Sequence, residues 1–215
     1  MKTALITGFN RGIGKVTAEK FLNAGWRVIG ICRNTEDAFQ HENLTAIPFD
    51  LSNVEAIADL VSQIDSLDVL INNAGIINGT RDEKLSINLI SPVELAIQLG
   101  EKMNTGRIVN LASIAGYIGH SDLWYGVTKA GLINATKSLA QRFKGKIIVN
   151  AVAPGPVDTD MIKEIPEERI TNIVSKTAHK RVAKPEEVAD TVFWLATEST
   201  EYVNGTCIHI SDGAR

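Results

Sequence analysis

Short apolar runs alternate with amphipathic stretches along most of the chain. Seven runs rich in β-branched residues have the length of strands and lie at residues 3–7, 27–32, 44–49, 67–72, 108–111, 146–153 and 206–210. Between them, apolar residues recur at three- and four-residue intervals, which predicts helices near residues 15–24, 54–64, 83–103, 122–140 and 185–196. Because strands that are apolar throughout belong to sheets covered on both faces, the pattern predicts an α/β fold with a doubly wound parallel sheet of about seven strands.

Two places depart from this alternation. Ser91-Pro92 lies inside the predicted helix 83–103 and is a candidate break or new start, because proline disfavours a helix interior. The stretch 159–184 mixes polar and apolar residues and predicts short amphipathic pieces rather than one regular element.

Size and charge narrow the class of protein. With 215 residues, 44% of them hydrophobic, the chain can bury one sizeable core, so we expect a single domain over residues 1–215. A formal net charge of -3 gives no long-range field that attracts nucleic acid or an anionic membrane. No apolar run approaches the roughly 18 residues of a membrane span, and the start MKTALITG lacks the apolar core of a signal peptide. We expect a cytoplasmic protein with neither nucleic acid nor membrane as a partner.

Cysteines and histidines suggest neither a disulfide nor a metal. Cys32 and Cys207 both lie in apolar strand-like runs, where a reduced, buried thiol is expected. The histidines are scattered without the carboxylate or cysteine spacing of a metal site, so no metal is expected. They are His41, His120, His179 and His209.

The stretch 107–140 carries a Ser, a Tyr and a Lys in an order that suits acid-base chemistry. Tyr125 and Lys129 lie one turn apart on one face of a predicted helix. An ammonium near a phenol favours the phenolate, which lowers the tyrosine pKa from about 10 and makes Tyr125 a candidate general acid-base. Ser113, at the end of the preceding strand, could hydrogen-bond the same substrate oxygen. By itself, however, a Tyr and a Lys four residues apart on a helix are more often structural.

A glycine-rich turn joins the first strand to the first helix. Gly8, Gly12 and Gly14 allow backbone N–H groups and a helix N-terminus to approach a phosphate, although they could serve only a tight turn. The spacing departs from G-x-G-x-x-G. It also fails as a P-loop, because Phe9 and Val16 stand where glycine and a hydroxyl residue are needed.

Together, motifs in a fixed order make the chain resemble the short-chain dehydrogenase/reductase family over almost its whole length, most closely the 3-oxoacyl-thioester reductases. The motifs are TGFNRGIG at Thr7 to Gly14, NNAG at Asn72 to Gly75, Asn88 in SINL, Ser113, YGVTK at Tyr125 to Lys129, Pro154-Gly155 with Thr159, and PEEVA at Pro185 to Ala189. The resemblance implies a Rossmann-like sheet and a nicotinamide dinucleotide as cofactor.

The resemblance also implies roles for individual residues. Tyr125 would donate the proton, and Lys129 would bind the nicotinamide ribose and lower the Tyr125 pKa. Ser113 would polarise the carbonyl, and Asn88 would hold a proton-relay water. The expected cofactor contacts are Gly8, Asn10, Arg11, Gly12, Ile13, Gly14, Arg33, Asp50, Asn73, Ala74, Gly75, Tyr125, Lys129, Pro154, Gly155, Val157 and Thr159.

The end of the second strand predicts which dinucleotide is preferred. Arg33-Asn34 stands where NAD enzymes carry an acidic residue that binds the ribose. Arg11 in the glycine turn adds a second cation. We therefore expect NADP(H) to be preferred over NAD(H).

The predicted activity is hydride transfer between NADP(H) and a small-molecule carbonyl/alcohol pair. Two alternatives stay open: a non-catalytic dinucleotide-binding or redox-sensing protein, and an epimerase or dehydratase on the same scaffold, for whose usual substrate domain the chain leaves little room. Because the helix 83–103 contributes to subunit contacts in the family, a homodimer or homotetramer is expected.

Three features set this chain apart or shape its substrate site. Gly75 and Asn88 are only 13 positions apart, shorter than usual in the family, which predicts a more open cleft. The ending SDGAR replaces a more usual DGG-like ending. In 159–184, Met161, Ile162, Ile165 and Ile170 alternate with charges, and we expect this segment to be a mobile substrate cover that closes over the site.

Overall fold

The sheet contains seven parallel strands in the order β3-β2-β1-β4-β5-β6-β7. The computed structural model describes residues 1–36, 38–163 and 167–213. The strands are β1 (Thr3–Thr7), β2 (Arg27–Cys32), β3 (Leu44–Pro48), β4 (Val69–Asn72), β5 (Gly106–Leu111), β6 (Ile147–Pro154) and β7 (Cys207–Ile210). This arrangement confirms the predicted doubly wound parallel sheet.

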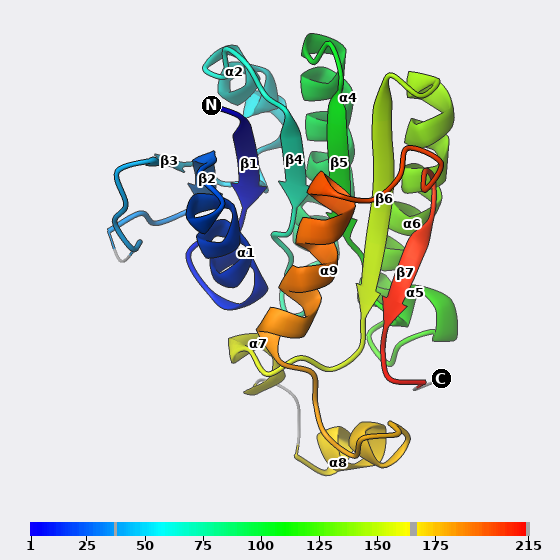
Figure 1. The fold of residues 1–215 in the computed structure, drawn as a ribbon. Helices are drawn as coiled ribbons and strands as arrows, with labels where there is room; N and C mark the ends of the chain where they lie inside the picture. The colour runs from blue at the N-terminus through cyan, green and yellow to red at the C-terminus, as the bar shows by residue number, and fades with distance from the viewer. Residues whose placement is uncertain (37, 164–166, 214–215) are drawn as a thin grey trace.

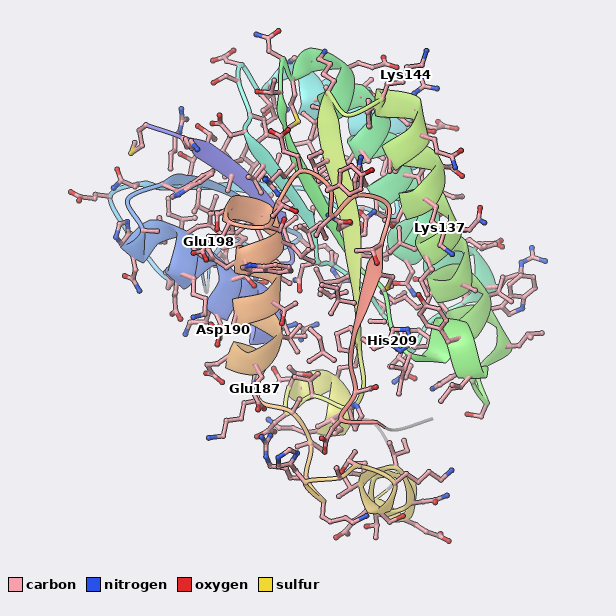
Figure 2. All side chains as sticks on the ribbon, turned by 45° about the vertical axis from the view of Figure 1, so that its right-hand side comes forward. Lys137, Lys144, Glu187, Asp190, Glu198 and His209 are labelled. Carbon is pink, nitrogen blue, oxygen red and sulfur yellow. The ribbon has the colours of Figure 1, made fainter. Side chains whose placement is uncertain are left out.

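Helices cover both faces of the sheet. The helices α1 (Gly12–Asn23) and α9 (Pro185–Thr197) lie on one face, and α2 (Ile57–Ser62), α4 (Ser91–Lys102) and α6 (Leu123–Phe143) lie on the other (Figure 1). Each face has its own apolar core between helices and strands. Lys20 of α1 forms an ion pair with Asp190, which Figure 2 labels on α9. The apolar stripes predicted for these helices therefore face the sheet.

Short helices connect these layers. They are the 3₁₀ turn η1 (Val54–Ala56), α3 (Arg81–Leu85), the π-helical turn η2 (Ser86–Ile90), α5 (Ala115–Ile118), α7 (Asp160–Lys163) and α8 (Glu167–Ser175). The predicted helix 54–64 thus begins as a 3₁₀ turn and ends at Ser62. The short helices α5, α7 and α8 lie beyond the carboxyl ends of the strands, where ligands bind in such sheets (Figure 1).

Ser91-Pro92 does not break the helix. Ser91 has helical dihedral angles (φ -59°, ψ -45°), and the backbone stays helical from Arg81 to Lys102. The Ser91 N–H bonds to the Ser86 carbonyl in the π register just before Pro92, which has no N–H to donate. The local irregularity is therefore a π turn over Ser86–Ile90 rather than an interruption.

One glycine in the sheet positions the glycine turn. A Cβ on Gly30 of β2 would lie 2.5 Å from the ring of Phe9, which is fully buried. Gly30 thereby leaves the space in which Phe9 packs, and Phe9 fastens the turn onto the sheet.

Both cysteines are free, but only Cys32 is buried as predicted. Cys207 is half-buried because β7 is an edge strand of the sheet. Within the described ranges, no helix is long and apolar enough to span a membrane.

Candidate active site

The glycine turn brings α1 close to the end of β1. Gly8 and Gly12 have positive φ angles of 67° and 53°, a region that favours glycine. A Cβ on Gly14 would collide with the Gly8 carbonyl oxygen and with the Asn73 amide. Close packing thus explains Gly14, while Gly8 and Gly12 shape a turn at the N-terminus of α1, where an anion is favoured.

The turn is joined to the end of β4. The Thr7 hydroxyl accepts the N–H groups of Asn73 and Ala74, both at 3.0 Å. In return, the Asn73 amide donates to the carbonyls of Thr7 at 2.9 Å and Gly8 at 3.1 Å. These bonds fix the geometry between the glycine turn and the residues that follow β4.

A cleft of about 410 Å³ runs along these segments. Eleven of the predicted cofactor residues line it: Gly8, Asn10, Arg11, Gly12, Ile13, Arg33, Asp50, Asn73, Ala74, Gly75 and Thr159. Nine further lining residues are not among the expected cofactor contacts, although Asn34 and Met161 lie in stretches that the sequence singles out: Ile31, Cys32, Asn34, Phe49, Leu51, Ile76, Ile87, Asp160 and Met161. Each of them is next to, or two positions from, a predicted site residue, so proximity to those residues is the signal that could have found them.

Opposite charges share this cleft. Arg11 and Arg33 are exposed at its lining, together with Asp50 and Asp160. A hydrogen bond from Lys163 holds the pKa of Asp160 below its ordinary value, and the nearby charge of Arg11 adds to this. Asp160 therefore partly offsets Arg11, whereas Arg33 stands at the end of β2, where a ribose would lie.

Ser113, Tyr125 and Lys129 come together at the carboxyl end of β5. Ser113 follows β5, and its hydroxyl is hydrogen-bonded to Tyr125. Tyr125 and Lys129 are buried in the first two turns of α6, with the Lys129 Nζ 5.8 Å from the centre of the Tyr125 ring. Lys129 Nζ donates to the Leu111 carbonyl at 2.8 Å.

The pKa values differ from the expectation. Burial raises the pKa of Tyr125, and the hydrogen bond with Ser113 offsets only part of that effect. Burial also lowers the pKa of Lys129 to about 8. The expected lowering of the Tyr125 pKa by Lys129 is therefore not found in the protein alone, because desolvation penalises both charged forms.

Asn88 lies beside this group, on the π turn η2. Its side chain is fully buried and pairs with both backbone groups of Ile76, each at 2.8 Å. Its amide also donates to the Thr128 hydroxyl at 3.4 Å. A Cβ on Gly75 would lie 3.3 Å from Asn88 Oδ1 and 3.3 Å from Lys129 Nζ, so Gly75 joins the cleft to the Tyr125 group.

Some predicted residues lie away from the cleft lining. Pro154 and Val157 are buried, and the Gly155 N–H bonds to the Ile210 carbonyl at 2.9 Å. Gly155 lines a separate hollow of about 300 Å³ near the end of β7. The part of the chain that the structure describes contains no group of three or more His, Cys, Asp or Glu side chains that could hold a metal ion.

Comparisons with known proteins agree with this geometry. A family model described as enoyl-(acyl carrier protein) reductase matches residues 8–215. The 3-oxoacyl-[acyl-carrier-protein] reductase FabG of Aquifex aeolicus is 34% identical over 242 residues, covering 99% of this chain and 96% of the relative. FabG of Rickettsia bellii is 35% identical over 232 residues with the same coverage. The chain belongs to the short-chain dehydrogenase/reductase family.

Solved structures of similar proteins support the same conclusion. One is a 4-hydroxyisoleucine dehydrogenase complexed with NADH, with a TM-score of 0.91 and 28% identity over 99% of this chain and 98% of that one. Another is BdcA in complex with NADPH, with a TM-score of 0.90 and 32% identity over 99% of this chain and 93% of that one. As a member of the short-chain dehydrogenase/reductase family, the protein is an oxidoreductase that uses a nicotinamide cofactor and acts on a CH–OH/C=O pair.

The residues present suit such a cofactor. The glycine turn lines the cleft at the α1 N-terminus, where, among the described residues, no side-chain hydrogen bond caps the helix at Arg11, and both arginines lie on the same cleft. In this family member, Gly8 to Gly14 would hold the phosphates, and Arg33 with Asp50 would face the adenosine part.

The burial of Lys129 predicts a stability gain when its charge is removed. A pKa lowered from 10.5 to about 8 corresponds to about 3 kcal/mol, of which the lost hydrogen bond to Leu111 removes about 1. Lys129→Met should therefore raise the free energy of unfolding at pH 7 by about 2 kcal/mol, measured by urea denaturation. The exposed Lys137→Met is the matched control and should change it by less than about 0.5 kcal/mol.

The difference in stability between Lys129→Met and wild type should also change with pH. The unfolded chain keeps this proton up to about pH 10.5, whereas the folded protein releases it near pH 8. Wild-type stability therefore rises between these pH values, and the advantage of Lys129→Met should shrink over the same range. A constant difference from pH 7 to 10 would contradict the assignment.

Proposed function

We propose that the protein is an NADP(H)-dependent oxidoreductase of carbonyl/alcohol substrates in which Tyr125 is the general acid-base. The observation that carries this proposal is the position of the buried Tyr125 beside the dinucleotide cleft. Tyr125 is hydrogen-bonded to Ser113, and the Lys129 Nζ, one helical turn further on, lies over its ring.

The geometry supports a division of roles. A nicotinamide cofactor, when bound, would supply the hydride that reduces the carbonyl carbon. Tyr125 gives its proton to the carbonyl oxygen, and its raised pKa keeps that proton in place until it is needed. Ser113 donates to the same oxygen, and a charged Lys129 favours the phenolate that forms. Asn88 is held by its bonds to Ile76 and Thr128, and its part in a proton relay stays a prediction.

Replacing Tyr125 by Phe tests the proposal. Tyr125→Phe keeps the ring but removes the transferable proton, so kcat should fall by about 10²- to 10⁴-fold while NADPH affinity changes little. NADPH oxidation with a panel of ketones and 3-oxoacyl thioesters measures turnover, and fluorescence titration measures binding. The fully exposed Tyr202→Phe is the control. Near-normal kcat in Tyr125→Phe would mean that another group is the acid.

The substrate class is proposed from the relatives. Both FabG proteins are named for reducing 3-oxoacyl groups on acyl carrier protein, so a 3-oxoacyl thioester is the first substrate to test. The matching family model carries an enoyl reductase description, so a 2-enoyl thioester belongs in the same panel. Product formation without net NADPH oxidation would favour an epimerase or dehydratase, and cofactor binding without turnover would favour a sensor.

The preference for NADP(H) is proposed from Arg33. Arg33 lines the cleft at the end of β2, and charged hydrogen bonds to a 2′-phosphate contribute roughly 1.5–3 kcal/mol each. Arg33→Ala should reduce the ratio of NADPH to NADH affinity by about 10- to 100-fold. Arg142→Ala, whose guanidinium pairs with Glu101 away from the cleft, should leave the ratio unchanged. An unaltered ratio in Arg33→Ala would count against the assignment.

Residues 159–163 and 167–184 are proposed as the substrate cover. Val157 and Ala183 form a β-bridge that holds the two ends of this segment together. Three residues of the segment line the cleft, namely Thr159, Asp160 and Met161. Its helix α8 lies at the outer end, apart from the sheet (Figure 1). Ile162 and Ile170 are half-buried, while Ile165 lies outside the described residues. Few neighbours hold α8, which favours motion of this part.

Hydrogen exchange tests the cover. Amides of α7 and α8 should gain protection of about tenfold or more when cofactor and substrate bind together, because closure removes them from solvent. The buried strand β5 is the internal control. Equal exchange of α7 and α8 in both states would refute closure.

The oligomeric state and the cellular location are proposed from exposed apolar side chains and from the free cysteines. Ile90, Trp124 and Val127 are large apolar side chains exposed on η2 and α6, which favours a homodimer or homotetramer through this side. Two free cysteines fit a reducing cytoplasm.

A further inference from the structure

Lys84 is a buried cation in the short connection between Gly75 and Asn88. It lies on α3, and its residue is only 6% exposed. Among the described residues, Lys84 and Lys129 are the charged side chains that are buried. An ammonium is costly to bury unless it is paired, so its partner defines what it does.

That partner is Asp122, directly before α6. Lys84 Nζ pairs with Asp122 Oδ2, while Asp122 Oδ1 accepts the N–H of Tyr125 at 2.9 Å. Asp122 is thus the N-cap of the helix that carries Tyr125. The hydrogen bond from Lys84 lowers the pKa of Asp122 most, followed by that from Tyr125. The carboxylate therefore links Lys84 to the backbone of Tyr125.

Other contacts place α3 and η2 along the same part of α6. The Arg81 guanidinium lies 5.7 Å from the centre of the Trp124 ring, and Asn88 reaches Thr128. These contacts lie at the end of α6 opposite Lys144, which Figure 2 labels. The short connection therefore contacts the first turns of α6 at residues just before and just after Tyr125 in the sequence.

We propose that Lys84 is a positioning residue for Tyr125, acting through Asp122. Lys84 holds the Asp122 carboxylate so that it caps α6, and the cap fixes the Tyr125 side chain against Ser113. This inference rests on the proposed role of Tyr125. Because neither Lys84 nor Asp122 lines the dinucleotide cleft, the pair affects kcat rather than cofactor affinity.

Kinetics of five variants test this link. Lys84→Met should lower kcat about tenfold, since a loosened reacting group is costly, with NADPH affinity within about twofold of wild type. Lys84→Arg, which keeps the charge, should recover most of the loss. Added to Asp122→Ala, Lys84→Met should cause no further loss, because its effect passes through Asp122. The control is Lys102→Met. Lys102 Nζ bonds to the carbonyls of Val61 in α2 and of Ile64 just after it, so its loss should leave kcat unchanged.

Amide exchange provides a readout that does not need activity. Exchange of the Tyr125 N–H should speed up at least about fivefold in Lys84→Met, while amides in the middle of α6 stay unchanged. If wild type proves inactive on every carbonyl tested, the proposed function fails, whereas this measurement still decides whether Lys84 holds the cap. An unchanged Tyr125 exchange rate, an unchanged kcat, or an equal further loss on the Asp122→Ala background would each overturn the proposal. If Lys84→Met does not fold, Lys84→Gln, which removes the charge and keeps a polar end, carries the same measurements with the same expected losses.

Discussion

The Thr7 hydroxyl joins the ends of β1 and β4, the two neighbouring strands at which the order of strands along the chain reverses. It accepts the amides that follow β4, and β1 and β4 are the neighbours from which the chain order runs outward to both edges. In doubly wound sheets a crevice forms at this switch point because the connections on its two sides cover opposite faces. The cleft, the placement of Gly75 and the approach of Lys129 all depend on this junction.

Beyond that junction, the site holds two ionisable groups whose charged forms are disfavoured by burial. Lys129 is buried with its Nζ bonded to the Leu111 carbonyl, and the pKa of Tyr125 is raised in the same environment. Groups with perturbed pKa values cluster at functional sites, where their altered protonation serves the chemistry. Lys84 differs, because its ammonium has a carboxylate partner that also caps a helix.

The sequence predicts the sheet well because the strands are continuous apolar runs whose burial on both faces follows from composition. It also identifies the glycine turn and the Tyr125–Lys129 spacing, since both depend on residues close in the chain. The Lys84–Asp122 pair joins residues 38 positions apart and emerges only once α3 lies on α6. Likewise, the spacing predicts a lowered Tyr125 pKa, whereas burial, a property of the whole fold, sets the opposite direction. The π turn before Pro92 has no local signal in the pattern.

The bridge between Val157 and Ala183 has an evolutionary consequence. Since the two ends of the intervening segment bond to each other, that segment can be lengthened, shortened or exchanged without moving β6 or α9. Each doubling of such a loop costs only about 0.6 kcal/mol of closure entropy. The part of this segment beyond Met161 can therefore change in length and sequence while the lining of the dinucleotide cleft stays in place.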